Sequence, residues 1–194
     1  NKDALGKVDK DYSQLYEFKS ADIAIKMPDK IKVDGRLGMV KFEYIINGGE
    51  KIVRSPTLKI NRRDDYSTQP AKLQYAFDFG IITTSLWQNR SMEIIDDEAA
   101  AENCEIKVLL KWPTGDMKYY AYIDRENLWL KKFEKKDAQD NLRVRIVYSE
   151  PENLNDIIWV PTKIEMYAYD GSLAGISKIS GFNINSGIDN SFFE

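Results

Sequence analysis

Alternation of apolar and polar residues runs through most of this chain and predicts a long series of β-strands. It is clear from Ile23 to Val33, where apolar residues alternate with aspartate and lysine, and again from Val40 to Ile46. A period of two buries one face of a strand and leaves the other in water. Asn47-Gly48-Gly49 is typical of a tight hairpin, because Asn and Gly tolerate positive φ. The pattern predicts an antiparallel meander, twisted enough to curl into a barrel or half-barrel.

The strands are separated by turn residues throughout. A return strand is expected over Ile52–Ile60, and Pro56 within it indicates an edge or a bulge. Asp96–Asn103 is expected to be a polar turn whose alanine-rich middle could form one helical turn. The later strands are expected at Met92–Ile95, Cys104–Trp112, Lys118–Asp124, Leu128–Lys136, Leu142–Tyr148, Ile157–Tyr169 and Ala174–Asn185. All of them are expected in a single sheet that carries most of the chain.

Two stretches depart from alternation and predict helices. Asp3–Leu15 has apolar residues at helical spacing and a charged opposite face, which favours a short amphipathic helix. The second helix is expected to begin at Pro70, since a first helical position does not need the missing N–H, and to reach Trp87. Arg62–Asp65 would lead into it.

The second helix is apolar but has a weak middle. Leu73, Phe77 and Ile81 recur every four residues and so share one face. Gly80 and the β-branched run over 81–84 are poor helix formers. Two interpretations follow: a fixed core helix that plugs an open sheet, or a movable lid over an apolar cavity.

Composition limits the function classes. The chain has 194 residues, 43% hydrophobic and 30% charged, which suits one globular domain over 1–194. Its net charge of -3 makes nucleic acid an unexpected partner. No apolar run approaches the ~18 residues that a membrane-spanning helix needs.

The absence of histidine weighs against an enzyme. It removes Ser-His-Asp and Cys-His chemistry and the commonest zinc ligands. Cys104 is the single cysteine, so no thiolate cluster can form, and the acidic run Asp96-Asp97-Glu98 is expected to be a solvated turn. We therefore expect no enzyme activity, metal or cofactor. An enzyme based on carboxylates, Lys or Tyr stays open as a third possibility.

The order of these elements, with several short motifs, resembles the LolA-like outer-membrane lipoprotein carriers over nearly the whole chain. The motifs are Lys26-Met27-Pro28-Asp29-Lys30-Ile31, Asn47-Gly48-Gly49-Glu50-Lys51, Tyr122-Ile123-Asp124-Arg125-Glu126-Asn127, Ile158-Trp159-Val160-Pro161-Thr162-Lys163-Ile164-Glu165 and Phe182-Asn183-Ile184-Asn185-Ser186-Gly187-Ile188-Asp189. The resemblance implies an open antiparallel half-barrel closed by helices, with an apolar cavity that holds acyl chains outside the cytoplasm. Relatives on this fold include carriers, a membrane-anchored acceptor and stress-response sensors, and fold alone does not choose among them.

One position departs from the carriers. They have an arginine just before the strand-ending proline that latches the lid, and Met27 stands there in this chain. A charged latch is therefore not expected. Closure of a lid would depend on apolar contacts instead.

Together these observations predict a mainly β (α+β) fold, a curved antiparallel half-barrel closed by helices. The expected function is extracytoplasmic binding of lipid or lipoprotein acyl chains, in the periplasm or cell envelope, with lipoprotein sorting or transport as its setting. A membrane-bound loading or accepting protein would be a further partner, and a lipid anchor could belong to the precursor. The alternative is a non-enzymatic sensor or interaction domain with a closed cavity.

The apolar strand residues before residue 47 are expected to face the concave side, with Lys26, Lys30, Lys32, Lys41 and Glu43 outward. The predicted acyl-binding residues are Ile23, Ile25, Met27, Ile31, Val33, Phe42, Tyr44, Ile46, Leu73, Phe77, Ile81, Leu86 and Trp87.

Overall fold

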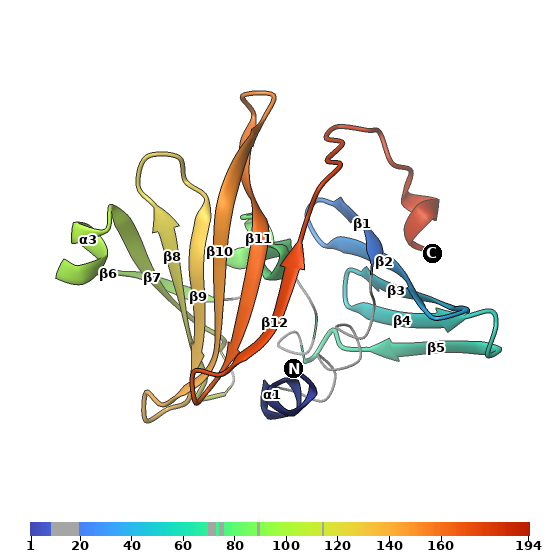
Figure 1. Cartoon of the computed structure of the whole chain (residues 1–194), viewed down its shortest axis with the longest axis horizontal. Helices are drawn as coiled ribbons and strands as arrows, with labels where there is room; N and C mark the ends of the chain where they lie inside the picture. The colour runs from blue at the N-terminus through green and yellow to red at the C-terminus, as the bar shows by residue number, and fades with distance from the viewer. Residues whose placement is uncertain (9–19, 70–72, 74–75, 89, 114) are drawn as a thin grey trace.

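The strands form two antiparallel sheets (Figure 1). The computed structural model describes residues 1–8, 20–69, 73, 76–88, 90–113 and 115–194. The small sheet has the order β1 (Ala21–Lys26), β2 (Lys30–Leu37), β3 (Val40–Asn47), β4 (Glu50–Ser55) and β5 (Ile60–Asp65). The large sheet contains, in chain order, β6 (Ser91–Ile95), β7 (Glu105–Lys111), β8 (Lys118–Asp124), β9 (Leu130–Lys136), β10 (Leu142–Leu154), β11 (Ile158–Ala168) and β12 (Leu173–Lys178).

The helices within the described ranges are short. They are α1 (Lys2–Val8), α3 (Glu98–Glu102) and the 3-10 turns η2 (Ala76–Phe79), η3 (Thr84–Leu86) and η4 (Asn190–Phe193). The expected helical turn after Asp96 is α3, whose N-cap Asp97 accepts a hydrogen bond from the Ala100 N–H. A helix long and apolar enough to cross a membrane is not found in the described part of the chain.

The meander is confirmed, but the prediction of a single sheet is wrong. Every strand pairs with its neighbour in sequence except at one place, where β5 and β6 belong to different sheets. Residues 66–90 join them and supply no strand in the described positions. Four described apolar side chains of this segment, Leu73, Phe79, Ile82 and Leu86, pack against the two sheets, and this interrupts the ladder.

The strand limits differ from the prediction in three places. The chain turns after Ser55, so Pro56 lies in a turn and Arg62–Asp65 belong to β5. β10 continues to Leu154, beyond its expected end at Tyr148. β12 ends at Lys178, well before Asn185, because the following residues leave the large sheet. The first helix is confirmed over α1, and residues 9–15 of that prediction lie outside the described residues.

The second predicted helix is not continuous. Residues 70–72 and 74–75 lie outside the described residues. In the described remainder, η2 and η3 are separated by Gly80, whose φ is +77°. The Ile81 N–H bonds to the Ala76 carbonyl at 3.1 Å across it, a pattern that ends helices at a glycine. Gly80 is therefore a helix stop.

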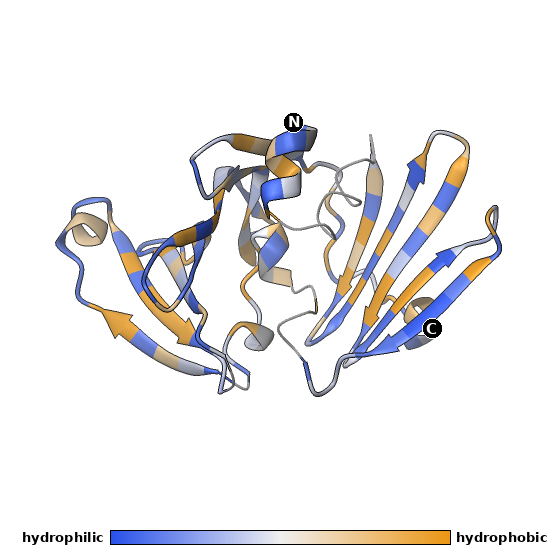
Figure 2. Cartoon of the chain, turned by 90° about the horizontal axis from the view of Figure 1, so that it is seen from below, coloured by the Kyte–Doolittle hydropathy of each residue, from blue (hydrophilic) through white to orange (hydrophobic). Residues whose placement is uncertain are grey.

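Three apolar clusters stabilise the fold. The largest lies on the inner face of the large sheet and includes Leu5 of α1, Leu86 and Phe133. The second lies on the inner face of the small sheet, around Ile31. The third lies on its outer face, around Phe193. Figure 2 shows the two sheets facing one another across the middle of the molecule.

An ion pair fixes α1 to the turn between β11 and β12. Lys7 Nζ donates to Asp170 Oδ2 at 2.7 Å. This hydrogen bond, with others from Ser172, holds the pKa of Asp170 well below its ordinary value of 3.8.

Acid should therefore weaken this attachment. Because the folded state binds the Asp170 proton less tightly than the unfolded chain, its stabilisation is present above the ordinary pKa and is lost as pH falls below it. We expect Asp170→Asn to melt below the parent at neutral pH, and the difference to shrink at about pH 2. A melting series over pH checks this; a difference that does not change with pH would contradict it.

Candidate ligand-binding face

The inner face of β1, β2 and β3 is an apolar floor. The register sets Ile31 opposite Ile25 and Ile46, and Val33 opposite Ile23 and Tyr44. Residues directly opposite one another in antiparallel strands point to the same face. Ile31, Val33 and Ile46 are buried there. The predicted facing of these strands is therefore confirmed, and we call this surface the floor.

The segment after β5 covers part of the floor and also reaches the other sheet. Leu73 and Phe79 pack against the floor cluster. A few residues later, Leu86 is buried in the core of the large sheet, and Ile82 packs against the same core. This segment thus forms an apolar wedge that touches both inner faces, and we call its described residues, 73 and 76–87, the wedge.

Gly80 lets the wedge approach the large sheet closely. A Cβ placed on it would lie 2.2 Å from Pro161 Cγ and 2.9 Å from Tyr148 Cδ1. Neither the proline ring nor a tyrosine ring that is buried in the core can move away easily. Gly80 therefore satisfies two requirements, a positive φ and a missing side chain.

The structure places about half of the predicted binding residues together and the others elsewhere. Ile25, Ile31, Val33, Tyr44, Ile46 and Leu73 come together in the floor cluster. Leu86 belongs to the large-sheet core, while Ile23, Met27 and Trp87 are exposed. Phe42 and Ile81 are half-buried, and Phe77 lies in η2 with its side chain outside the described part.

Sequence reasoning missed three contributors to this face. Phe79 packs on the floor, although the four-residue spacing placed Phe77 there instead. Leu37 and Ile60 extend the inner face towards the β2–β3 and β4–β5 turns, and both are exposed. The apolar floor therefore continues beyond the part that the wedge covers.

The outer face of the small sheet is not simply wet. Phe193 is fully buried there against Ile45 and Ile52. The chain after β12 crosses to this side, and η4 lies over it (Figure 1). The lysines point outward as predicted, but Lys26 Nζ donates to the Ile188 carbonyl at 2.7 Å and Lys32 lies 4.4 Å from the Phe192 ring centre. In the sequence, the signal that both faces of this strand are covered was the pair of consecutive apolar residues, Ile45 and Ile46.

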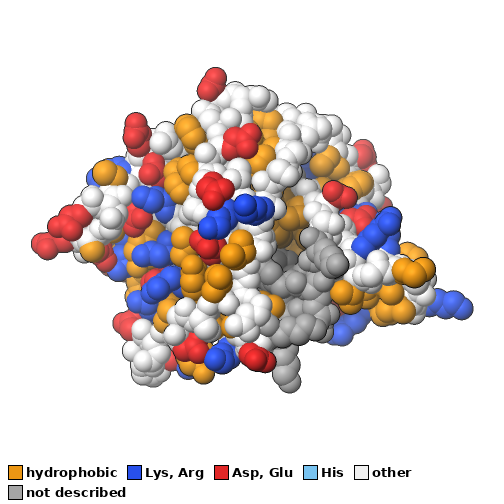
Figure 3. All heavy atoms as spheres, viewed as in Figure 1, with side chains coloured by type: hydrophobic (Ala, Val, Ile, Leu, Met, Phe, Trp, Pro, Cys, Tyr) orange, Lys and Arg blue, Asp and Glu red, His pale blue; other side chains and the backbone are white. Residues whose placement is uncertain are grey.

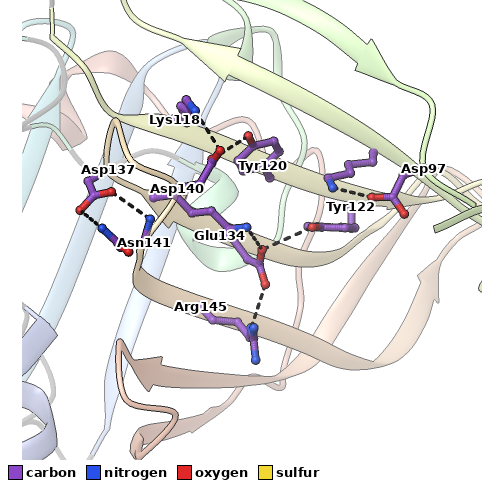
Figure 4. Close-up of polar contacts among 11 residues, drawn as sticks. Asp97, Lys118, Tyr120, Tyr122, Glu134, Asp137, Asp140, Asn141 and Arg145 are labelled. Carbon is purple, nitrogen blue, oxygen red and sulfur yellow. Dashed lines mark hydrogen bonds and ion pairs between the residues drawn. The ribbon is translucent and has the colours of Figure 1, made fainter. Parts of the chain in front are cut away.

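A polar network covers the outer face of the large sheet (Figure 4). Glu134 is buried, accepts from Arg145 Nε at 2.8 Å and from the Tyr122 hydroxyl at 3.3 Å, and lies 3.7 Å from Lys136 Nζ. Burial, followed by the Glu134 charge, raises the Tyr122 pKa above its ordinary value of 10. Nearby, Asp140 accepts from Lys118 and Tyr120. Each carboxylate has its own cation, which is typical of a structural network.

Chemistry-bearing groups do not converge on the floor. Among the described residues, no three His, Cys, Asp or Glu side chains are placed to hold a metal ion. The small sheet does contain one buried hydroxyl without a hydrogen-bond partner in the described structure, Ser55 Oγ. The part of the floor around Ile31 can therefore bind apolar groups by burial. On the same face of β4 and β5 the register places charged side chains, Lys51, Arg62 and Asp64.

Comparison of the fold with solved structures places it in a known class. It is similar to a domain from Vibrio parahaemolyticus classed as an outer membrane lipoprotein-sorting protein, with a TM-score of 0.61, 11% identity, and 89% of this chain and 79% of that one covered. This likeness confirms the LolA-like resemblance at the level of fold.

Two further structures match less closely. A LolA superfamily protein from Nitrosomonas europaea has a TM-score of 0.47 and 14% identity, with 98% of this chain and 95% of that one covered. A DUF1329 family protein from Desulfovibrio piger has a TM-score of 0.45 and 12% identity, with 85% and 81% covered. No protein-family model matches the chain. A search of curated proteins by sequence found no significant match.

Proposed function

We propose that the protein binds acyl chains of lipids or lipoproteins on the floor of the small sheet, outside the cytoplasm. The observation that supports this most directly is an apolar inner face that extends past the wedge, with Ile23, Leu37 and Ile60 exposed on it. The likeness to the Vibrio lipoprotein-sorting domain supports the same class of ligand. A lipoprotein carrier or acceptor role, with a membrane-bound partner, fits this binding.

Affinity would come from burial of methylenes, at roughly 0.8 kcal/mol for each CH₂ removed from water. Met27 is exposed, in the turn that follows β1, and it offers no charged group to hold the wedge shut. Opening of the wedge would therefore break apolar contacts, chiefly those of Leu73 and Phe79 with the floor.

A second function is favoured by the way the wedge fills the space. Because Leu73 and Phe79 already cover the floor, and Leu86 is buried in the other core, the protein could instead be a sensor or interaction domain whose interior is closed by its own side chains. The two functions differ in what happens when Phe79 is removed.

Phe79→Ala should strengthen the binding of a fluorescent fatty acid to the protein. If the acyl chain must displace the Phe79 ring, loss of about 1.4 kcal/mol of ring contacts would tighten binding by about tenfold. A titration of the probe with parent and variant, beside their melting curves, measures this.

Leu86→Ala is the matched control within the wedge. It removes a fully buried side chain from the large-sheet core and should lower stability by about 2 to 5 kcal/mol, yet leave the probe affinity of the folded protein unchanged. A parent that binds no probe, together with a Phe79→Ala variant that only melts lower, would favour the closed sensor domain.

A further inference from the structure

Two turns at one end of the small sheet expose large apolar side chains. Leu37, which is 41% exposed, ends β2, and Met39, which is 97% exposed, lies in the turn that follows. The β4–β5 turn contains Leu58 at 51%, and Ile60, at 39%, opens the next strand. Unbranched methionine adapts readily to a soft apolar surface.

The two turns lie side by side at the same edge. β3 and β4 are joined at the opposite end, where Asn47 faces Glu50, so the turns before β3 and after β4 must share this end. Adjacent strands are about 4.8 Å apart, and the turns are therefore roughly 10 Å from one another. Figure 1 shows them projecting together, away from the large sheet. We call these two turns the tips.

The tips are also basic, although the protein as a whole is acidic. The chain has a net charge of -3, yet residues 35–42 and 55–63 contain five Lys or Arg and no Asp or Glu. Within the described residues, Arg36 and Lys59 form no ion pair, and both are exposed. Figure 3 shows hydrophobic side chains with Lys and Arg beside them at this end of the molecule.

We propose that the tips dock on an anionic membrane surface. Exposed apolar side chains would enter the headgroup region, while Arg36 and Lys59 contact anionic headgroups, a combination that holds peripheral proteins on membranes. A protein partner would need a groove that accepts two separate turns. A membrane needs only a flat, negatively charged and deformable surface, which fits two tips that project from the same end of the sheet.

Docking of this kind would help the proposed function but does not depend on it. The inner-face residues Leu37 and Ile60 lead from the tips to the floor, so docking would bring this margin of the floor next to the bilayer. Met39 and Leu58 lie in the turns themselves and away from the floor. Changes at these two residues therefore test docking separately from acyl binding.

Flotation of the full chain with vesicles tests the proposal. We expect binding to vesicles of phosphatidylcholine with about one quarter phosphatidylglycerol, weak binding to pure phosphatidylcholine, and release in about 1 M salt, where the screening length falls to about 3 Å. Met39→Asp with Leu58→Asp should weaken binding at least about tenfold, as should Arg36→Glu with Lys59→Glu. Binding of the soluble fatty-acid probe should be unchanged in both variants.

The matched control is Ile176→Asp with Lys178→Glu on β12, an exposed apolar and basic pair on the large sheet. It should bind vesicles within about twofold of the parent, since the residues lie away from the tips. An equal loss of vesicle binding in this control would show that net charge alone determines binding, and it would overturn the proposal. So would a parent that binds neither kind of vesicle, or one whose tip variants bind as the parent does.

Discussion

Gly80→Ala should be among the most destabilising single changes in the protein. The added Cβ would meet Pro161 Cγ at 2.2 Å and Tyr148 Cδ1 at 2.9 Å. A left-handed conformation costs an alanine about 1 to 2 kcal/mol, and overpacking of a core costs about 1 to 3 kcal/mol more. For a chain of this length, a loss of about 3 kcal/mol lowers the melting temperature by roughly 6 to 12 °C.

Gly171→Ala separates the two causes. Gly171 has a φ of +79°, nearly that of Gly80, but no atom lies within 4 Å of its added Cβ. Gly171→Ala should lower the free energy of unfolding only by the cost of the left-handed conformation, about 1 to 2 kcal/mol. Chemical denaturation of both variants gives the difference. Equal losses would mean that the wedge does not press against Pro161.

Phe193→Ala should be comparably destabilising, although Phe193 lies in the last turn of the chain. Its ring is fully buried against Ile45 and Ile52, and truncation of a buried phenylalanine costs about 3 to 5 kcal/mol. Its neighbour Phe192 is 46% exposed and provides the control. Phe192→Ala should cost under about 1 kcal/mol, mostly the loss of the contact with Lys32.

Thermal melts of the two variants show whether the C-terminal segment is required for the stability of the small sheet. A large loss for Phe193→Ala alone means that the outer face of the small sheet requires its cover. Similar small losses in both would show that the small sheet is stable without it.

Strand positions could be predicted because their signal is local. Period-two alternation from Ile23 to Val33 and the Asn47-Gly48-Gly49 turn fix both pairing and facing, since a slip of one residue would expose the floor. β8 was predicted to the residue, as alternation ends at clear turn residues on both sides.

The wedge could not be predicted in the same way. Its apolar residues fit a helix by spacing, but tertiary contacts decide the outcome: Phe79 packs on one sheet and Leu86 on the other, with Gly80 turning the chain between them. A helix of weak formers gives way when packing offers more burial. The division into two sheets follows from this segment, and no local sequence pattern predicts it.

The floor was predictable, while its cover and its margins were not. Ile31, Val33 and Ile46 were identified from alternation alone. Phe193 on the opposite face depends on a contact across about 140 residues of sequence, of the kind that one sequence does not reveal. The exposed Leu37 and Ile60 look, in sequence, like ordinary strand residues.

Photoaffinity mapping with a diazirine fatty acid tests the central claim most directly. The probe is photolysed on the protein in solution, and the modified residues are found by peptide mass spectrometry. We expect modification within β1, β2 and β3 at inner-face residues such as Ile23, Val33 and Tyr44, and competition by unlabelled fatty acid. Modification confined to the outer faces, or labelling that unlabelled fatty acid does not reduce, would contradict acyl binding on the floor.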